Sequence, residues 1–105
     1  MDKNYNERMR LFKDANKIKI TDTQLKQGCE LIKRKMNRNG QTYLETHRNG
    51  KKVFVGWIEK WGDSYIITFM GYTYKCAFTF EEAVTAILQL GLALHNNDYT
   101  FHYDR

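Results

Sequence analysis

Basic and aromatic residues that could contact a polyanion alternate along one region of the chain. Asn49-Gly50 predicts a tight hairpin that pairs Arg48 with Lys51, and Gly62-Asp63 predicts a second hairpin. Because strand side chains alternate between two faces, both turns direct tryptophan, cationic and threonine side chains to one face. Lysine and arginine contact phosphates, and tryptophan offers a stacking surface for bases. The candidate nucleic-acid-binding residues are Arg48, Lys51, Trp57, Trp61, Thr46, Thr68 and Lys75, assisted by Lys33 and Arg34 from a preceding helix.

A four-stranded antiparallel sheet is needed to position these residues. A third turn at Gly71-Tyr72 would pair Met70 with Thr73, which gives strands at about 41–48, 51–61, 64–70 and 73–78. In this register the face opposite the candidate site is apolar. Its members are Tyr43, Phe54, Ile58, Tyr65, Ile67, Phe69, Tyr74, Cys76 and Phe78. The candidate face also carries Thr42, Leu44, Val53, Val55, Ile66 and Thr73.

The segment 79–95 predicts the helix that covers the apolar face. Thr79 and Glu82 have the spacing of a capping box. The sequence that follows is apolar except for a narrow stripe formed by Glu81, Thr85 and Gln89, so most of the helix should be buried. We therefore expect an α+β fold, in which an antiparallel sheet of three to four strands packs on a C-terminal core helix.

A second helix over residues 22–36 is indicated by an apolar stripe of Leu25, Cys29, Ile32 and Met36, with Thr21 or Asp22 as its cap. Its other faces are basic, which makes it an N-terminal basic amphipathic helix. It could expose this basic surface, or it could cover the candidate sheet face as a second core layer. Residues 1–20 predict a polar basic segment with at most a short helix, and residues 21–105 a single α+β domain.

Charge is divided unevenly along the 105 residues. Residues 1–40 hold 11 Lys/Arg against 5 Asp/Glu, whereas residues 63–105 hold 2 against 5. A basic half of this kind favours a polyanionic partner. The two cysteines, Cys29 and Cys76, have no metal-ligand spacing and are expected to be buried thiols in a reducing compartment. No signal peptide or membrane span is evident, so a cytoplasmic location is expected.

Catalytic motifs are not evident in the sequence. His47, His95 and His102 are scattered, and the chain has no phosphate-binding glycine loop, zinc-protease motif or nucleophile elbow. His102 with Cys76 is a formal nucleophile pair, but nothing near either residue supports that chemistry. We expect a non-enzymatic protein with no cofactor and no metal.

The segment from Val53 to Tyr103 resembles the AP2-type DNA-binding domain of plant transcription factors and phage homing nucleases. Three predicted strands precede a helix that opens with FTFEEAVTAI, in which Phe78, Glu81, Glu82 and Ala83 match the start of that family's helix. Gly56-Trp57 and Trp61-Gly62 lie near its tryptophan and glycine positions. The resemblance implies a three-stranded sheet backed by one helix, with arginine and tryptophan side chains entering the major groove of DNA rather than RNA.

A protein partner is the alternative. The chain is small, rich in lysine, asparagine and tyrosine, and is similar to small proteins of Firmicute phages and mobile elements. Many of those are inhibitors or adaptors that bind one host or defence protein, as anti-CRISPR-like proteins do. Tryptophan, tyrosine and arginine dominate protein-binding hot spots, so the candidate face suits this function equally. The final YTFHY segment could also form a strand whose free edge builds a homodimer.

Overall fold

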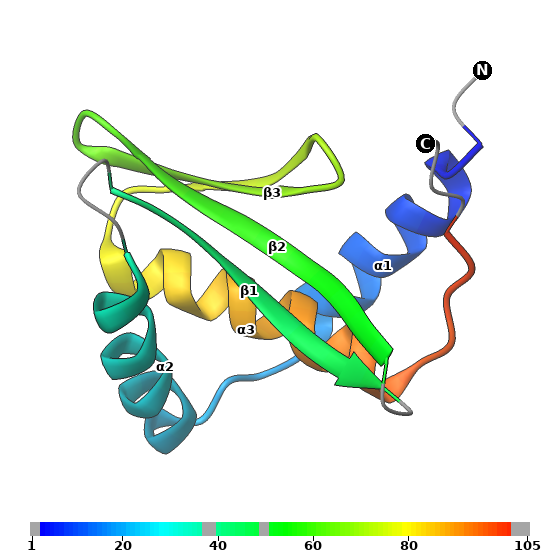
Figure 1. Ribbon diagram of the computed structural model, residues 1–105, viewed down its shortest axis with the longest axis horizontal. Coiled ribbons are helices and arrows are strands. Elements are labelled where there is room, and N and C mark those ends of the chain that lie inside the picture. Colours follow the sequence, from blue (N-terminus) through cyan, green and yellow to red (C-terminus); the bar gives the residue numbers. More distant parts are fainter. Residues whose placement is uncertain (1–2, 37–39, 49–50, 102–105) are drawn as a thin grey trace.

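A four-stranded antiparallel meander is the framework of the chain in the computed structural model, which describes residues 3–36, 40–48 and 51–101, without the side chains of 43–48 and 51–55. The strands are β1 (Gln41–Arg48), β2 (Lys51–Trp61), β3 (Ser64–Phe69) and β4 (Tyr72–Ala77), in the order β1-β2-β3-β4. Helices α1 (Tyr5–Lys17), α2 (Asp22–Lys35) and α3 (Phe80–Asn96) gather on one side of this sheet (Figure 1). The predicted α+β class is confirmed.

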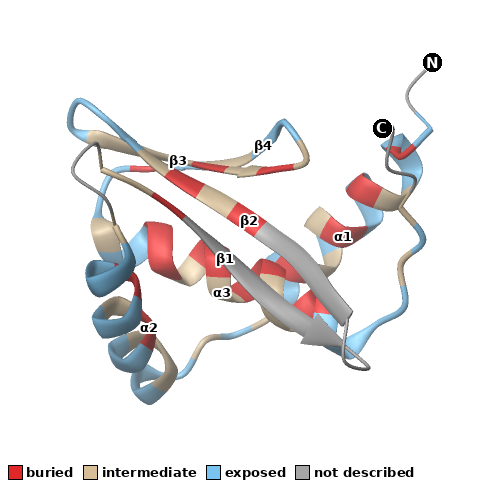
Figure 2. Ribbon diagram, in the orientation of Figure 1, coloured by how far each residue is buried: buried red, intermediate tan, exposed pale blue. Residues whose placement is uncertain are grey.

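Helix α3 is the core helix and packs along the sheet. Its N-cap is Thr79, whose hydroxyl accepts a hydrogen bond from the Glu82 backbone amide at 3.1 Å. Glu82 reaches one residue further back than a capping box requires, to the amide of Phe78. Close approach to β2 depends on Gly56, because a Cβ there would lie 2.9 Å from the Ile87 Cδ1 atom. The apolar side of α3 is therefore buried on the sheet (Figure 2).

Helix α2 packs against α3 rather than covering the other face of the sheet. Thr21 and Gln24 form a capping box at its start. The predicted stripe of Leu25, Cys29, Ile32 and Met36 joins the core. Gly28, which weakens an isolated helix, permits the contact, since a Cβ there would meet Leu88 at 2.8 Å. The possibility that α2 forms a second core layer over the candidate face is thus excluded.

Helix α1 is longer and better packed than the sequence pattern suggested. The helix buries Arg8, Leu11 and Ala15, and its N-cap Asn4 is also buried, whereas Tyr5 and Met9 are exposed. The chain after α3 lies along this helix. Arg10 donates to the Asp98 carbonyl at 2.7 Å, and the Thr100 amide donates to Glu7 at 2.9 Å.

The tail is not a strand in the part that the structure describes, residues 97–101, so a C-terminal pairing edge is not seen there. Its aromatic residues instead contact the helix side of the molecule. Tyr99 donates its hydroxyl hydrogen bond to Asp14, and the Phe101 ring meets the Phe69 ring at 5.2 Å. His102 and Tyr103 lie outside the described residues.

Two β-bulges change the predicted register of the sheet. The β2–β3 register is as predicted, with Ile58 opposite Ile67 and Trp61 opposite Ser64. Between β1 and β2, Arg48 pairs with Lys51 as expected, but a shift between Leu44 and Glu45 then places Thr42 opposite Ile58. Thr42 is consequently buried on the helix side, although the unbroken alternation predicted it on the other face.

The β3–β4 turn is one residue earlier than predicted. Met70 and Gly71 both have left-handed backbone angles, with φ of 51° and 83°, and Phe69 pairs with Tyr72. A second shift between Ile67 and Thr68 makes Tyr74 the extra residue of a bulge.

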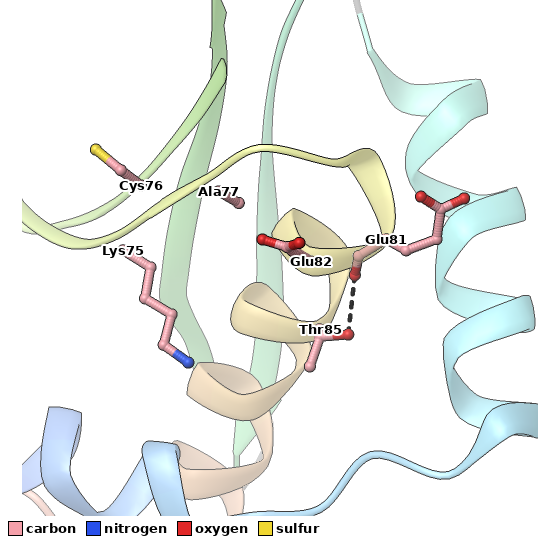
Figure 3. A pocket seen from close by; sticks show the side chains of 6 residues that line it. All are labelled: Lys75, Cys76, Ala77, Glu81, Glu82 and Thr85. Carbon is pink, nitrogen blue, oxygen red and sulfur yellow. Dashed lines mark hydrogen bonds between the residues drawn. The ribbon is translucent and has the colours of Figure 1, made fainter. Parts of the chain in front are cut away.

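This β4 register reverses the predicted faces of three residues. Ala77, not Cys76 or Phe78, is buried against the helices, and Lys75 lies on the helix side. Figure 3 shows Lys75 extending along α3 while the Cys76 sulfur points away from it. The prediction of a buried Cys76 was therefore wrong.

Candidate functional site

The face of the sheet that no described helix covers is the candidate site. We call it the open face, and define it by residues that alternate with the buried Ile58 and Ile67 and by their register partners. Its described members are Gln41, Trp57, Glu59, Trp61, Ser64, Ile66, Thr68, Thr73 and Cys76. Three strands other than β2 contribute residues, so the open face depends on the whole sheet and not on one loop.

Trp57, Glu59 and Trp61 form the centre of the open face. They occupy alternate positions of β2, so their side chains project from the same face of the sheet. The rise per residue of a strand places the Cα atoms of Trp57 and Trp61 about 13 Å apart. Trp57 is half-buried, whereas the Trp61 side chain is 61% exposed at the end of the strand. Two indole rings therefore flank one carboxylate.

The carboxylate of Glu59 is held by neutral donors. Gln41 Nε2 donates to Glu59 Oε1 at 2.7 Å across the β1–β2 pair. This hydrogen bond, followed by hydrogen bonds from the side chains of Trp61 and Trp57, holds the pKa of Glu59 below its ordinary value against the opposing effect of desolvation. Glu59 is thus an anion at neutral pH.

The structure divides the predicted site residues into three groups. Trp57, Trp61 and Thr68 lie on the open face as expected. Lys75 does not, since its Nζ lies 3.4 Å from Gln89 Oε1 on α3. The side chains of Arg48, Lys51 and Thr46 lie outside the described residues, and only their backbone register is defined.

Lys33 and Arg34 are exposed in the last turn of α2, on the helix side of the molecule. Cations in that position interact favourably with the carbonyl end of a helix, so their location has a structural explanation of its own. Lys33 also lies 5.8 Å from the centroid of the Phe80 ring. These two cations belong to a different surface from the tryptophans.

Sequence reasoning missed Glu59. No motif marks a lone glutamate in a strand, and the expected basic character of the face drew attention to its lysine and arginine residues. The period-two spacing of Trp57, Glu59 and Trp61 contained the signal, because these three share a face in any register of β2.

A hollow of about 270 Å³ lies between β4 and the first turns of α3, lined by Lys75, Cys76, Ala77, Glu81, Glu82 and Thr85 (Figure 3). Its polar groups serve the fold. The Thr85 hydroxyl donates to the Glu81 carbonyl at 2.8 Å, and Glu82 accepts from the Phe78 amide. These contacts give no paired nucleophile and base in the hollow.

The described part of the chain has neither a cluster of metal ligands nor a membrane-spanning helix. No three histidine, cysteine, aspartate or glutamate side chains there are grouped as a metal ion would require. None of its helices is both long and apolar enough to cross a bilayer. Both cysteines are free thiols.

Comparisons with protein families, with curated proteins and with solved structures find no match to this chain. The similarity to AP2-type domains and to small phage proteins therefore stays a prediction. The three strands and helix that the resemblance implies are present as β2, β3, β4 and α3, which is an agreement of element order alone. The function has to be argued from the open face itself.

Proposed function

We propose that this chain is a small non-enzymatic binding protein that docks on a protein partner through its open face. The observation that carries the proposal is Trp61, a large apolar side chain left 61% exposed beside Trp57. Tryptophan is one of the residues most enriched in protein-binding hot spots. Ile66, the register partner of Glu59, and Thr68, the register partner of Trp57, extend this surface onto β3 with aliphatic and hydroxyl groups.

The charge of the described part of the open face favours a protein over a nucleic acid. The one charged side chain placed among its described members is Glu59, which is negative and would repel phosphate. Lys75, which was expected to attract phosphate there, lies on the opposite side. An inhibitor or adaptor that binds one host or defence protein is consistent with this arrangement.

Affinity capture with matched variants tests the proposal. Immobilised wild-type chain, Trp61→Ala and Leu31→Ala are exposed to nuclease-treated lysate of the cells that encode the chain, and retained proteins are identified by mass spectrometry. Leu31 is a matched control because it is an exposed apolar residue of α2, 39% exposed, on the helix side.

We expect wild type and Leu31→Ala to retain the same protein, whereas Trp61→Ala loses it. With the purified partner, Trp61→Ala should weaken binding by about 2 kcal/mol, roughly 30-fold. Equal affinity of Trp61→Ala and wild type would overturn the proposal.

Nucleic-acid binding is the second candidate, and the basic end of α2 is the observation in its favour. Lys33, Arg34 and Lys35 are consecutive and all exposed. Fluorescence anisotropy with single- and double-stranded DNA and RNA across a salt series decides between the two candidates. Binding whose affinity falls steeply with salt, and less steeply in Lys33→Ala/Arg34→Ala, would establish this function because each neutralised phosphate releases counterions.

A further inference from the structure

Three aromatic rings on the helix side contact cations of the chain itself. The Arg8 guanidinium carbon lies 3.5 Å from the centroid of the Tyr72 ring, and that of Arg10 lies 4.3 Å from the Tyr99 centroid. Lys75 lies 5.3 Å from the Tyr74 centroid. The face of an aromatic ring attracts a cation, so these contacts contribute to stability within the chain.

Trp61, on the other side of the sheet, differs from these three rings. It is more exposed than Tyr72, yet none of the described cations lies over its ring. Tryptophan is the best of the aromatic side chains for such contacts. The Trp61 ring on the open face is therefore available to a cation that the described part of the chain does not supply.

Glu59 is the second half of the same arrangement. The hydrogen bond that Glu59 accepts comes from the neutral amide of Gln41, and none of the described lysines or arginines forms an ion pair with Glu59. A carboxylate has about four lone-pair positions, so at least one acceptor position remains beside the one that Gln41 occupies. The Glu59 carboxylate is therefore oriented by Gln41 and has no cationic partner among the described residues.

We propose, as a refinement of the proposed function on which it rests, that Trp57, Glu59 and Trp61 form a receptor for one cationic side chain of the protein partner. Arginine suits it best. A planar guanidinium can stack on the exposed Trp61 ring and at the same time donate to the remaining acceptor position of Glu59. The partner would thus present an arginine at the centre of its interface, surrounded by apolar groups that cover Ile66 and Thr68.

The receptor can be tested without the partner. The chain has two tryptophans, so a ¹⁵N-labelled sample gives two indole N–H signals in a heteronuclear NMR spectrum. The probe is N-acetyl-arginine amide, and its neutral isostere N-acetyl-citrulline amide is the matched ligand. We expect the arginine derivative to move both indole signals saturably, with an apparent affinity at least fivefold higher than that of the citrulline derivative. The difference should shrink as salt is added, because exposed charges are screened.

Variants locate the binding charge. Glu59→Gln keeps the shape of the side chain and should reduce the affinity for the arginine derivative at least fivefold. Asp63→Asn removes the same charge from the adjacent turn, outside the receptor, and should leave it unchanged. Equal shifts with the arginine and citrulline derivatives on wild-type protein would overturn the receptor, whether or not a variant folds. A second outcome separates the two proposals. If the wild-type chain captures no protein from lysate but its indole signals still move with the arginine derivative, the proposed function is overturned and the receptor is retained.

Discussion

The two sides of the sheet differ in how their polar and aromatic groups are satisfied. On the helix side, Gln89 is 7% exposed and its amide nitrogen donates to the Ile18 carbonyl at 2.9 Å. Its oxygen accepts from the Tyr74 hydroxyl at 3.1 Å and from Lys75. On the open face, the carboxylate of Glu59 has neutral donors and Trp61 faces solvent. On the helix side, Gln89 is therefore hydrogen-bonded within the chain. On the open face, the described groups Glu59 and Trp61 remain accessible to a partner.

We expect the helix side of the sheet to determine stability and the open face to determine binding. Groups on the helix side join segments far apart in sequence, since Gln89 connects α3 with β4 and with the chain between α1 and α2. Removing them should cost folding free energy. The described open-face side chains point away from the helices, so removing an exposed one such as Trp61 should change binding and leave the fold nearly intact.

The largest effect is expected from a charge placed between α3 and the sheet. Ile87 is fully buried against Gly56, and Ile87→Asp would leave a carboxylate there with no partner. We expect a loss of more than about 4 kcal/mol of unfolding free energy, which removes cooperative thermal unfolding measured by circular dichroism. Gln27→Asp, on the exposed face of α2, is the control and should cost under about 1 kcal/mol. An Ile87→Asp chain that melts like wild type would show that α3 is misplaced.

A moderate effect is expected at Gln89. Gln89→Leu leaves the Ile18 carbonyl and the Tyr74 hydroxyl without their partner, so unfolding free energy measured in urea should fall by about 1–3 kcal/mol. The same substitution at the exposed Gln27 is the matched control and should stay within about 0.5 kcal/mol. If both variants lose the same unfolding free energy, the hydrogen bonds of Gln89 to Ile18 and Tyr74 do not stabilise the fold.

The two thiols should differ in reactivity. Burial raises the pKa of Cys29, whose thiol contacts the core, whereas Cys76 is exposed on the open face. With a disulfide thiol reagent at pH 8, Cys76 should react rapidly and Cys29 more slowly. Cys76→Ser should remove the fast phase. A slow Cys76 would mean that the predicted register of β4, and not the bulged one, is right.

The smallest effect is a shift in the titration of Glu59. Because its pKa in the folded state is lowered, Glu59 contributes stability above its ordinary pKa, and that contribution is lost as pH falls through the folded-state value. Tryptophan emission should change as Glu59 is protonated. Gln41→Ala removes the hydrogen bond that lowers the pKa most, so the midpoint should move up in pH. Glu59→Gln should abolish the transition, and an unmoved midpoint in Gln41→Ala would argue against the hydrogen bond.

The architecture was accessible from sequence because strong local signals agree. The Thr79 cap, the apolar run of α3 and the turn at Gly62-Asp63 all lie where expected. The bulges opposite Leu44 and at Tyr74 were not predictable, since a bulge adds one residue without altering the types of its neighbours. Each bulge reversed the faces of the residues beyond it.

The bulges affected the predicted site residues differently. Trp57 and Trp61 were placed correctly because they lie between the two bulges, in the uninterrupted β2–β3 register. Lys75 lies beyond the second bulge and was placed on the wrong face. The burial of Arg8 was overlooked because charged residues are seldom buried, and the Tyr72 ring on which its guanidinium packs is distant in the sequence.

Photo-crosslinking from each side of the sheet tests the central claim most directly. A benzoylphenylalanine is introduced at Thr73, exposed on the open face, or at Gln27, exposed on the helix side. After irradiation in lysate of the cells that encode the chain, the Thr73 position should give one protein adduct that is lost when Trp61→Ala is added. The Gln27 position should give none. A partner attached through Gln27, or nucleic acid recovered in place of a protein at Thr73, would contradict the assignment of the open face as a protein-binding surface.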